Sequence, residues 1–144
     1  MKKILIMGGN QFVGKEIVKK FLGKDYTVYV LNRGTRKNIE EVIFLKVDRD
    51  NFIEMENILK NIDVDIIIDV SAYTEEQVNI LHKVMKNKFK QYILISSASV
   101  YNNIECTPVN EESHTGENLI WGDYAKNKYL AEKITIENSK ICNF

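Results

Sequence analysis

The sequence is poor in cysteine and proline, with only Cys106, Cys142 and Pro108. The two cysteines have neither the spacing of a metal site nor the density of a disulfide framework. We therefore expect two ordinary thiols, buried or half-exposed, in a protein of the reducing cytoplasm. This pattern argues against a small secreted scaffold held together by disulfides.

Long apolar runs and an excess of one charge are also missing. The longest apolar stretches have the length of a strand, so we expect no membrane-spanning helix. The apolar run that follows Met1-Lys2-Lys3 is too short for a signal peptide. The 20 basic and 20 acidic side chains cancel, and the lysines are scattered along the chain. This balance argues against a nucleic-acid-binding surface and favours a small-molecule partner.

What the sequence does contain is an alternation of two kinds of segment. Short apolar and β-branched runs predict strands at KKILIM, YTVYVLN, VIFLKV, VDIIIDV and QYILISSASVY. Helical spacing of apolar residues predicts helices over residues 12–22, 52–62, 74–86 and 124–137. Thr74 is placed to cap the third helix, and residues 141–144 look like the opening of a sixth strand. The alternation predicts an α/β fold, with a parallel sheet covered by helices on both faces.

The stretch MGGNQFVG, residues 7–14, links the first strand to the first helix. Gly8 permits a sharp turn, and Gly14 lets helix and strand approach closely. Gln11 stands at the middle glycine position of a G-x-x-G-x-x-G spacing. Because the amides at a helix start attract anions, we predict a dinucleotide diphosphate here, although a purely structural corner stays open. The predicted cofactor-binding residues of this turn are Gly8, Asn10, Gln11, Phe12 and Val13.

The second strand ends in VLNRG, where an acidic residue would bind the ribose 2′-hydroxyl of NAD. Asn32 occupies that position, and Arg33 follows it. No carboxylate is present to repel a 2′-phosphate, and a guanidinium is available to pair with one. The pattern therefore favours NADP over NAD, with Arg36 and Lys37 in the same loop able to share the role. A surface arginine without function is the alternative.

Tyr124 and Lys128 are four residues apart, so they share one face of the predicted last helix. Proton transfer by a phenol near neutral pH needs a nearby positive charge, which a lysine ammonium supplies. Tyr129 and Lys133 have the same spacing, but point about 140° away from the first pair at 3.6 residues per turn. We choose Tyr124 and Lys128 because Tyr124 lies nearest the helix start, just after Gly122.

The serine-rich turn ISSASVY leaves the fifth strand at its carboxyl end, where open α/β sheets bind ligands. A serine hydroxyl there could hold a substrate oxygen opposite the tyrosine. Spacing alone does not decide among Ser96, Ser97 and Ser99. Together with the Tyr–Lys pair, such a serine could support hydride transfer, so the predicted catalytic residues are Ser97, Tyr124 and Lys128.

The segments GGNQFVG, LNRG, VDRD, DVSAYT, YILISSASVY and YAKNKYLAEK occur in the order typical of one family. The chain resembles the N-terminal, cofactor-binding part of the extended short-chain dehydrogenase/reductases, the NAD-dependent epimerase/dehydratase family. It is most similar to an atypical branch that includes the chloroplast stem-loop-binding proteins. That branch often has a non-glycine residue at the middle glycine position and NRG after the second strand.

The resemblance implies a Rossmann-type doubly wound parallel sheet in the strand order 3-2-1-4-5. It also implies that Asp48 meets the adenine amine and that Ser71 and Ala72 line the cofactor. Counted back from the Val-Tyr pair, Ser97 matches the active-site serine or threonine of the family. The implied cofactor is NADP or NAD, and the implied chemistry is that of an oxidoreductase, epimerase or dehydratase. The substrate would be a hydroxyl or keto group of a nucleotide sugar or similar metabolite.

Members of this family are considerably longer, so we expect a single NAD(P)-binding domain over residues 1–144, truncated before the C-terminal substrate region. The last strands of the family's sheet would then be missing, which leaves one sheet edge exposed or paired, as in a homodimer. Whether this chain alone turns over substrate stays open. The alternatives are a non-catalytic coenzyme sensor or scaffold, an RNA-binding member of the atypical branch, and an inert fragment.

Overall fold

A computed structural model describes residues 1–37, 39–102 and 108–141. Both cysteines, and with them the prediction about their thiols, lie outside the described residues. The chain divides into two compact units. We call residues 1–71 with 79–95 the sheet unit, and residues 72–78 with 96–144 the α4 unit.

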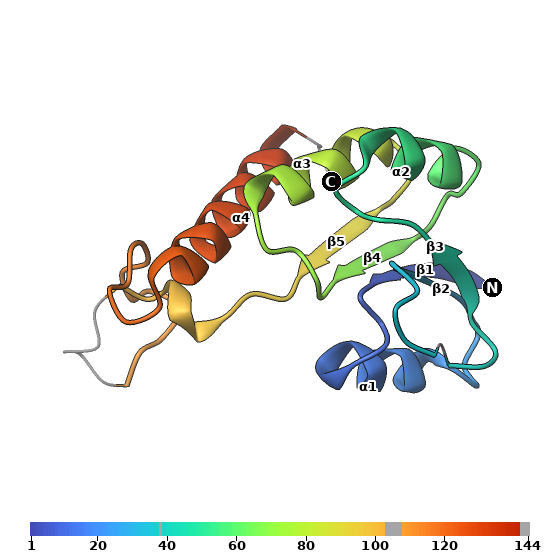
Figure 1. Cartoon of the computed structure of the whole chain (residues 1–144), viewed down its shortest axis with the longest axis horizontal. Helices are drawn as coiled ribbons and strands as arrows, with labels where there is room; N and C mark the ends of the chain where they lie inside the picture. The colour runs from blue at the N-terminus through green and yellow to red at the C-terminus, as the bar shows by residue number, and fades with distance from the viewer. Residues whose placement is uncertain (38, 103–107, 142–144) are drawn as a thin grey trace. The chain divides into compact units, whose positions relative to one another are not determined.

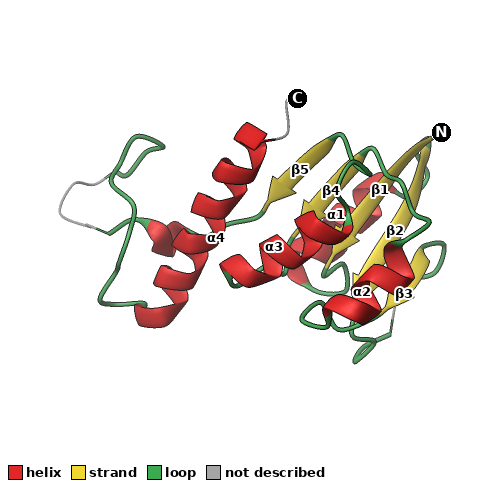
Figure 2. Cartoon of the chain, turned by 90° about the horizontal axis from the view of Figure 1, so that it is seen from above, coloured by secondary structure: helices red, strands yellow, loops and turns green. Residues whose placement is uncertain are grey.

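The sheet unit is built on five parallel strands in the order β3-β2-β1-β4-β5, which confirms the predicted topology. The strands are β1 (Lys2–Met7), β2 (Tyr26–Asn32), β3 (Ile43–Lys46), β4 (Ile66–Asp69) and β5 (Gln91–Leu94). The helices are α1 (Phe12–Phe21), α2 (Phe52–Leu59) and the later part of α3 (Glu75–Val84). Helix α1 covers one face of the sheet, and α2 and α3 cover the other (Figures 1 and 2).

The core lies on both faces of the sheet because alternate strand residues point to opposite sides. Leu5 and Met7 belong to the cluster beneath α2 and α3, whereas Ile4 and Ile6 pack with Val18 of α1. All five are fully buried. A strand covered on both faces needs apolar residues at successive positions, which explains the continuous apolar runs in the sequence.

The α4 unit contains the first residues of α3, the short 3-10 helix η1 (Ala98–Val100) and the long α4 (Gly122–Ile141). The Thr74 hydroxyl accepts from the Gln77 amide at 3.3 Å, as expected of the predicted helix cap. The predicted sixth strand is wrong for Ile141, which ends α4. Its other residues, 142–144, lie outside the described part of the chain.

The loop before α4 is fixed by one buried amide, that of Asn118. Its Nδ2 donates to the Tyr101 carbonyl at 2.8 Å, and its Oδ1 accepts from the Ile120 amide at 3.0 Å. Its backbone carbonyl accepts from the amides of Trp121 and Gly122, the residues at which α4 begins. Asn118 therefore sets the start of the helix that carries the predicted Tyr–Lys pair.

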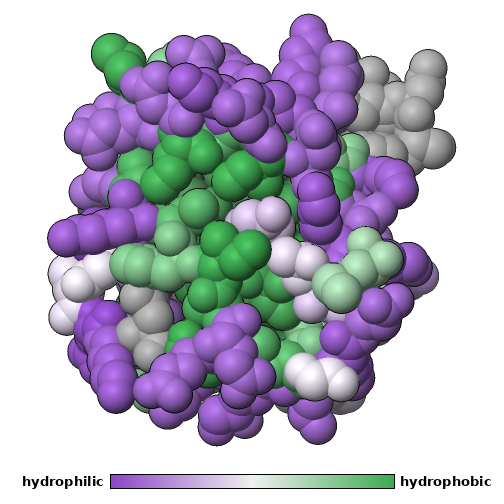
Figure 3. Space-filling view, turned by 90° about the vertical axis from the view of Figure 1, so that its right-hand side faces the viewer, coloured by the Kyte–Doolittle hydropathy of each residue, from purple (hydrophilic) through white to green (hydrophobic). Residues whose placement is uncertain are grey.

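Apolar side chains also reach the surface of the protein. Figure 3 shows a group of them bordered by hydrophilic side chains, on the side where β3 lies in Figure 1. Strand β3 is an edge of the sheet, and its Ile43 is 44% exposed. Within the described ranges, no helix combines the length and the apolar character needed to cross a bilayer.

Candidate coenzyme-binding turn and acid–base residues

The turn between β1 and α1 has the backbone of an anion-binding loop. Gly8 has a φ of 87°, a left-handed value that residues with a side chain rarely adopt. The backbone of Gln11 is extended, with a φ of −141°. Helix α1 begins at Phe12, and its first turn contains no acidic residue. The first amides of a helix have no partner within it, and the positive end of the helix dipole lies there. The turn can therefore hold a negatively charged group.

Gly8, Gly9 and Gly14 of this turn leave no space for a side chain, and a Cβ on Gly9 would lie 2.8 Å from Val18 Cγ2. A Cβ on Gly14 would overlap the Gly8 carbonyl oxygen, and a Cβ on Gly8 would lie 2.8 Å from the Ser71 Cβ. Gln11, in contrast, has a backbone conformation open to any residue. The absence of glycine at the middle position is therefore compatible with the turn. The left-handed conformation is adopted instead by Phe12, with a φ of 40° and a side chain that is 86% exposed.

The loop after β2 reaches the turn through Arg36. With its amide oxygen facing the guanidinium, Gln11 accepts from Nε and Nη2 of Arg36 at 2.7 and 2.6 Å. The Asn10 amide donates to the Arg36 carbonyl at 3.4 Å. Asn32 folds back on its own loop, since its side-chain oxygen accepts from the Gly34 amide at 2.8 Å. Both Arg33 and Arg36 are exposed, but it is Arg36 that contacts residues of the glycine turn.

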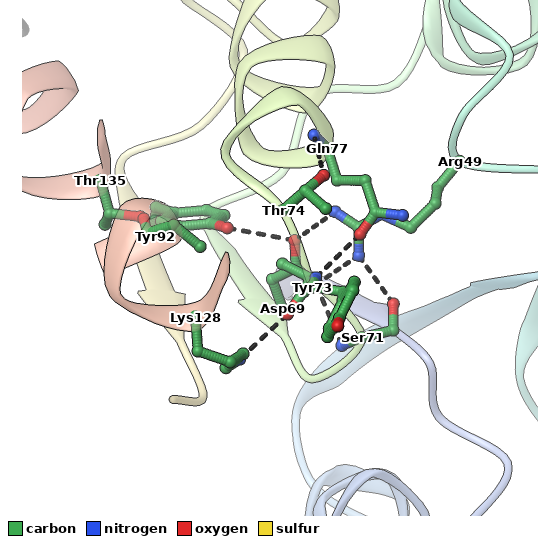
Figure 4. A network of polar contacts seen from close by, with 11 residues as sticks. Arg49, Asp69, Ser71, Tyr73, Thr74, Gln77, Tyr92, Lys128 and Thr135 are labelled. Atoms are coloured by element: carbon green, nitrogen blue, oxygen red, sulfur yellow. Dashed lines mark hydrogen bonds and ion pairs between the residues drawn. The ribbon is translucent and has the colours of Figure 1, made fainter. Parts of the chain in front are cut away.

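The carboxyl ends of β3 and β4 carry the other predicted cofactor residues of the sheet unit. Asp48 is half-buried, and its carboxylate accepts from the Asp50 amide at 3.1 Å. Ser71 follows β4, and its hydroxyl accepts from Nη1 of Arg49 at 2.8 Å. Arg49 also forms a buried, two-pronged ion pair with Asp69, at 2.7 Å for each bond. The sequence pattern did not single out this pair, which is drawn in Figure 4.

Asp69 shifts the pKa of two side chains that donate to it, those of Arg49 and Tyr92. Burial alone would lower the pKa of the Arg49 guanidinium, but the charge and hydrogen bonds of Asp69 outweigh burial and raise that pKa above its usual value. Tyr92 donates to Asp69 at 3.1 Å. Burial and the nearby negative charge of Asp69 raise the pKa of Tyr92, so its phenol stays protonated. Opposite charges at hydrogen-bonding distance cancel, so the pair brings no net charge to this edge of the sheet.

The predicted catalytic residues all belong to the α4 unit. Ser97 lies before η1, and its hydroxyl accepts from the amide and the hydroxyl of Ser99 at 3.2 and 2.9 Å. Lys128 is only 4% exposed and donates from Nζ to the Ala72 carbonyl at 2.9 Å. Tyr124 is 41% exposed. The Tyr124 ring lies 5.7 Å, between centroids, from that of Tyr73.

Burial separates the two Tyr-x-x-x-Lys pairs of α4. A lysine is almost never fully buried unless its ammonium has a partner, and Lys128 is buried with one. Lys133, in the second pair, is exposed. This contrast supports the choice of Tyr124 and Lys128, whose catalytic role remains a prediction. In the described part of the chain, no three His, Cys, Asp or Glu side chains are grouped as metal ligands.

Comparisons with known proteins identify the family of the chain. Residues 4–141 match the model of the NAD dependent epimerase/dehydratase family. The chain belongs to this family. One curated relative is the chloroplast stem-loop binding protein of 41 kDa b from Arabidopsis thaliana, 27% identical over 126 residues. The match covers 77% of this chain and 33% of that protein.

Solved structures of family enzymes share the fold. The UDP-Glc/GlcNAc 4-epimerase of Campylobacter jejuni superposes with a TM-score of 0.85 at 17% identity, over 98% of this chain and 50% of the epimerase. The UDP-glucose 4-epimerase of Bifidobacterium longum, in complex with NAD⁺ and UDP, gives a TM-score of 0.81 at 23% identity, over 96% and 49%. The chain thus spans about half the length of these epimerases.

Three features of this family member were not predicted from the sequence. They are the contact of Gln11 with Arg36, the Arg49–Asp69 ion pair and the anchoring role of Asn118. The ion pair had a weak signal. Asp69 ends an otherwise apolar strand, and a carboxylate within a buried strand usually has a charged partner. The contact between Gln11 and Arg36 corresponds to no periodic pattern in the sequence.

Proposed function

We propose that the chain binds a nicotinamide dinucleotide at the turn of residues 8–14 and carries the acid–base residues of an epimerase/dehydratase-type reaction. The observation that carries the proposal is the absence of space at Gly8 and Gly14, where a Cβ would meet neighbouring atoms. The diphosphate fits such a turn, because the amides at a helix start attract anions and no acidic residue of the first turn repels them.

The proposed chemistry uses residues of the α4 unit. A bound nicotinamide would supply an acceptor for the hydride of the substrate carbon that bears the hydroxyl. Tyr124 takes the proton of that hydroxyl. The C–H and O–H bonds of the substrate break, and a carbonyl double bond forms. Ser97 donates a hydrogen bond to the substrate oxygen. Lys128 supplies positive charge on the helix face of Tyr124, and its burial strengthens that effect.

The proposed substrate class is a nucleotide sugar with a free hydroxyl on the carbon that is oxidised. Solved structures with this fold include UDP-glucose and UDP-Glc/GlcNAc 4-epimerases. The second candidate function is RNA binding, because the Arabidopsis relative is named for binding stem loops. The formal net charge of zero disfavours this alternative, since binding to phosphate backbones depends on clustered Lys and Arg.

The test mixes excess protein with NAD⁺ and either UDP-glucose or UDP-GlcNAc, and follows formation of the reduced nicotinamide in a single turnover. We expect reduction only when protein, coenzyme and a sugar nucleotide are all present. Coenzyme binding without reduction would identify a sensor and contradict the catalytic half of the proposal. Binding of a stem-loop RNA without coenzyme binding would overturn the proposal altogether.

We further propose that the chain prefers NADPH to NADH, because Asn32 cannot repel a 2′-phosphate and Arg36 lies at the glycine turn. One charge-assisted hydrogen bond would give a preference of about tenfold. Titration calorimetry with both coenzymes should show this preference in the wild type and its loss in Arg36→Ala. Arg33→Ala is the matched control. Equal affinities in the wild type would contradict the preference, and its loss only in Arg33→Ala would assign it to Arg33.

A further inference from the structure

A buried polar network in the sheet unit surrounds the Asp69 carboxylate at the end of β4. Asp69 is fully buried, and four donors converge on it (Figure 4). Two come from the Arg49 guanidinium, one from the Ser71 amide at 3.1 Å and one from the Tyr92 hydroxyl at 3.1 Å. The network therefore connects the segments that follow β3 and β4 with strand β5.

Stability alone is a weak explanation for such a pair. The free energy needed to remove two charges from water is about as large as the free energy gained from their attraction. Replacing such a pair with apolar residues of similar size often leaves the stability of the fold unchanged or raises it. A direct role in binding a phosphate is also disfavoured, because Asp69 already neutralises the Arg49 charge at 2.7 Å. The pair instead orients Arg49, because a two-pronged contact fixes the plane and position of the guanidinium.

The fixed guanidinium in turn holds Ser71. The same Nη1 that donates to Asp69 also donates to the Ser71 hydroxyl at 2.8 Å, while the Ser71 amide donates back to Asp69. Ser71 is thus held at its side chain and at its backbone. Its Cβ lies 2.8 Å from where a Gly8 side chain would begin, so it packs directly against the glycine turn.

We propose that Arg49 is a positioning residue for the coenzyme, which acts through Ser71. Its guanidinium sets Ser71 against Gly8 and thereby fixes the wall of the diphosphate turn. The inference rests on the proposed function, because it assumes that this turn binds the dinucleotide.

The test is a double-mutant cycle between Arg49 and Ser71, read out as NADH affinity by titration calorimetry. Arg49→Lys keeps the charge but loses the two-pronged contact, and Ser71→Ala removes the hydroxyl that Arg49 holds. We expect each to weaken NADH binding by about tenfold, and the double variant to bind no more weakly than either single variant. If Arg49→Lys does not fold, Asp69→Asn replaces it in the cycle, because it loosens the same guanidinium without changing side-chain size.

Tyr92→Phe is the matched control. It removes one hydrogen bond from Asp69 but leaves the contact of Arg49 with Ser71 intact. Its thermal stability should fall, while NADH affinity should stay within about twofold of the wild type. Additive effects in the cycle, or unchanged affinity in Arg49→Lys, would overturn the positioning role. A wild-type chain that does not bind NADH would instead overturn the proposed function.

Discussion

Tyr124→Phe is expected to lower the rate of NAD⁺ reduction by a UDP-hexose about 100- to 10,000-fold, the usual effect of removing a positioned acid–base group. The substitution deletes one oxygen from a side chain that is 41% exposed, so the fold and coenzyme affinity should be retained. The measurement is the single-turnover reduction of nicotinamide, with calorimetric binding of NADH to the same samples.

Tyr129→Phe is a close control, because Tyr129 lies on the same helix and has its own lysine four residues later. Its partner Lys133 is exposed, whereas Lys128 is buried against the Ala72 carbonyl. The Tyr129 variant should react at the wild-type rate. If Tyr129→Phe loses activity and Tyr124→Phe keeps it, the second pair is the functional one and our assignment is wrong.

Gly14→Ala is expected to weaken NADH binding by at least about 100-fold, and to destabilise the fold by about 1–3 kcal/mol as overpacking does. The added methyl group would overlap the Gly8 carbonyl oxygen, so helix α1 or the turn must move. Either movement displaces the amides that we propose to hold the diphosphate. Urea unfolding gives the stability, and titration calorimetry gives the affinity.

Gly23→Asn separates this effect from a general intolerance of glycine substitution. Gly23 has a φ of 72°, which asparagine tolerates better than most residues, and a Cβ there would meet no atom within 4 Å. This variant should bind NADH as tightly as the wild type. If Gly14→Ala binds equally tightly, the turn does not act as the diphosphate site.

The alternation of strands and helices followed from local residue patterns, whereas the strand order came from the family resemblance. A parallel strand that is buried on both faces must be apolar at successive positions, as in VDIIIDV, and the helices between strands repeat apolar residues at helical spacing. The end of α4 had no such signal. The four residues after Lys140 are too few to distinguish a helical period from a strand, so the prediction of a strand at Ile141 is wrong.

The candidate site was predictable where backbone geometry decides, as at Gly8 and Gly14. It was not predictable where side chains from distant loops meet. The contact between Gln11 and Arg36 joins positions 25 residues apart, and the Arg49–Asp69 pair joins positions 20 apart. Neither spacing belongs to a helix or a strand, so no local pattern records it. Only the fold brings these side chains together.

The central claim is that the amides at the start of α1 bind the diphosphate of a nicotinamide dinucleotide. The most direct test is a titration of ¹⁵N-labelled protein with NADH, followed by backbone amide NMR shifts. We predict saturable shifts that are largest at residues 8–14, with Asn10, Gln11, Phe12 and Val13 among them. Saturable shifts that spare this turn, or no saturable shift at all, would contradict the claim.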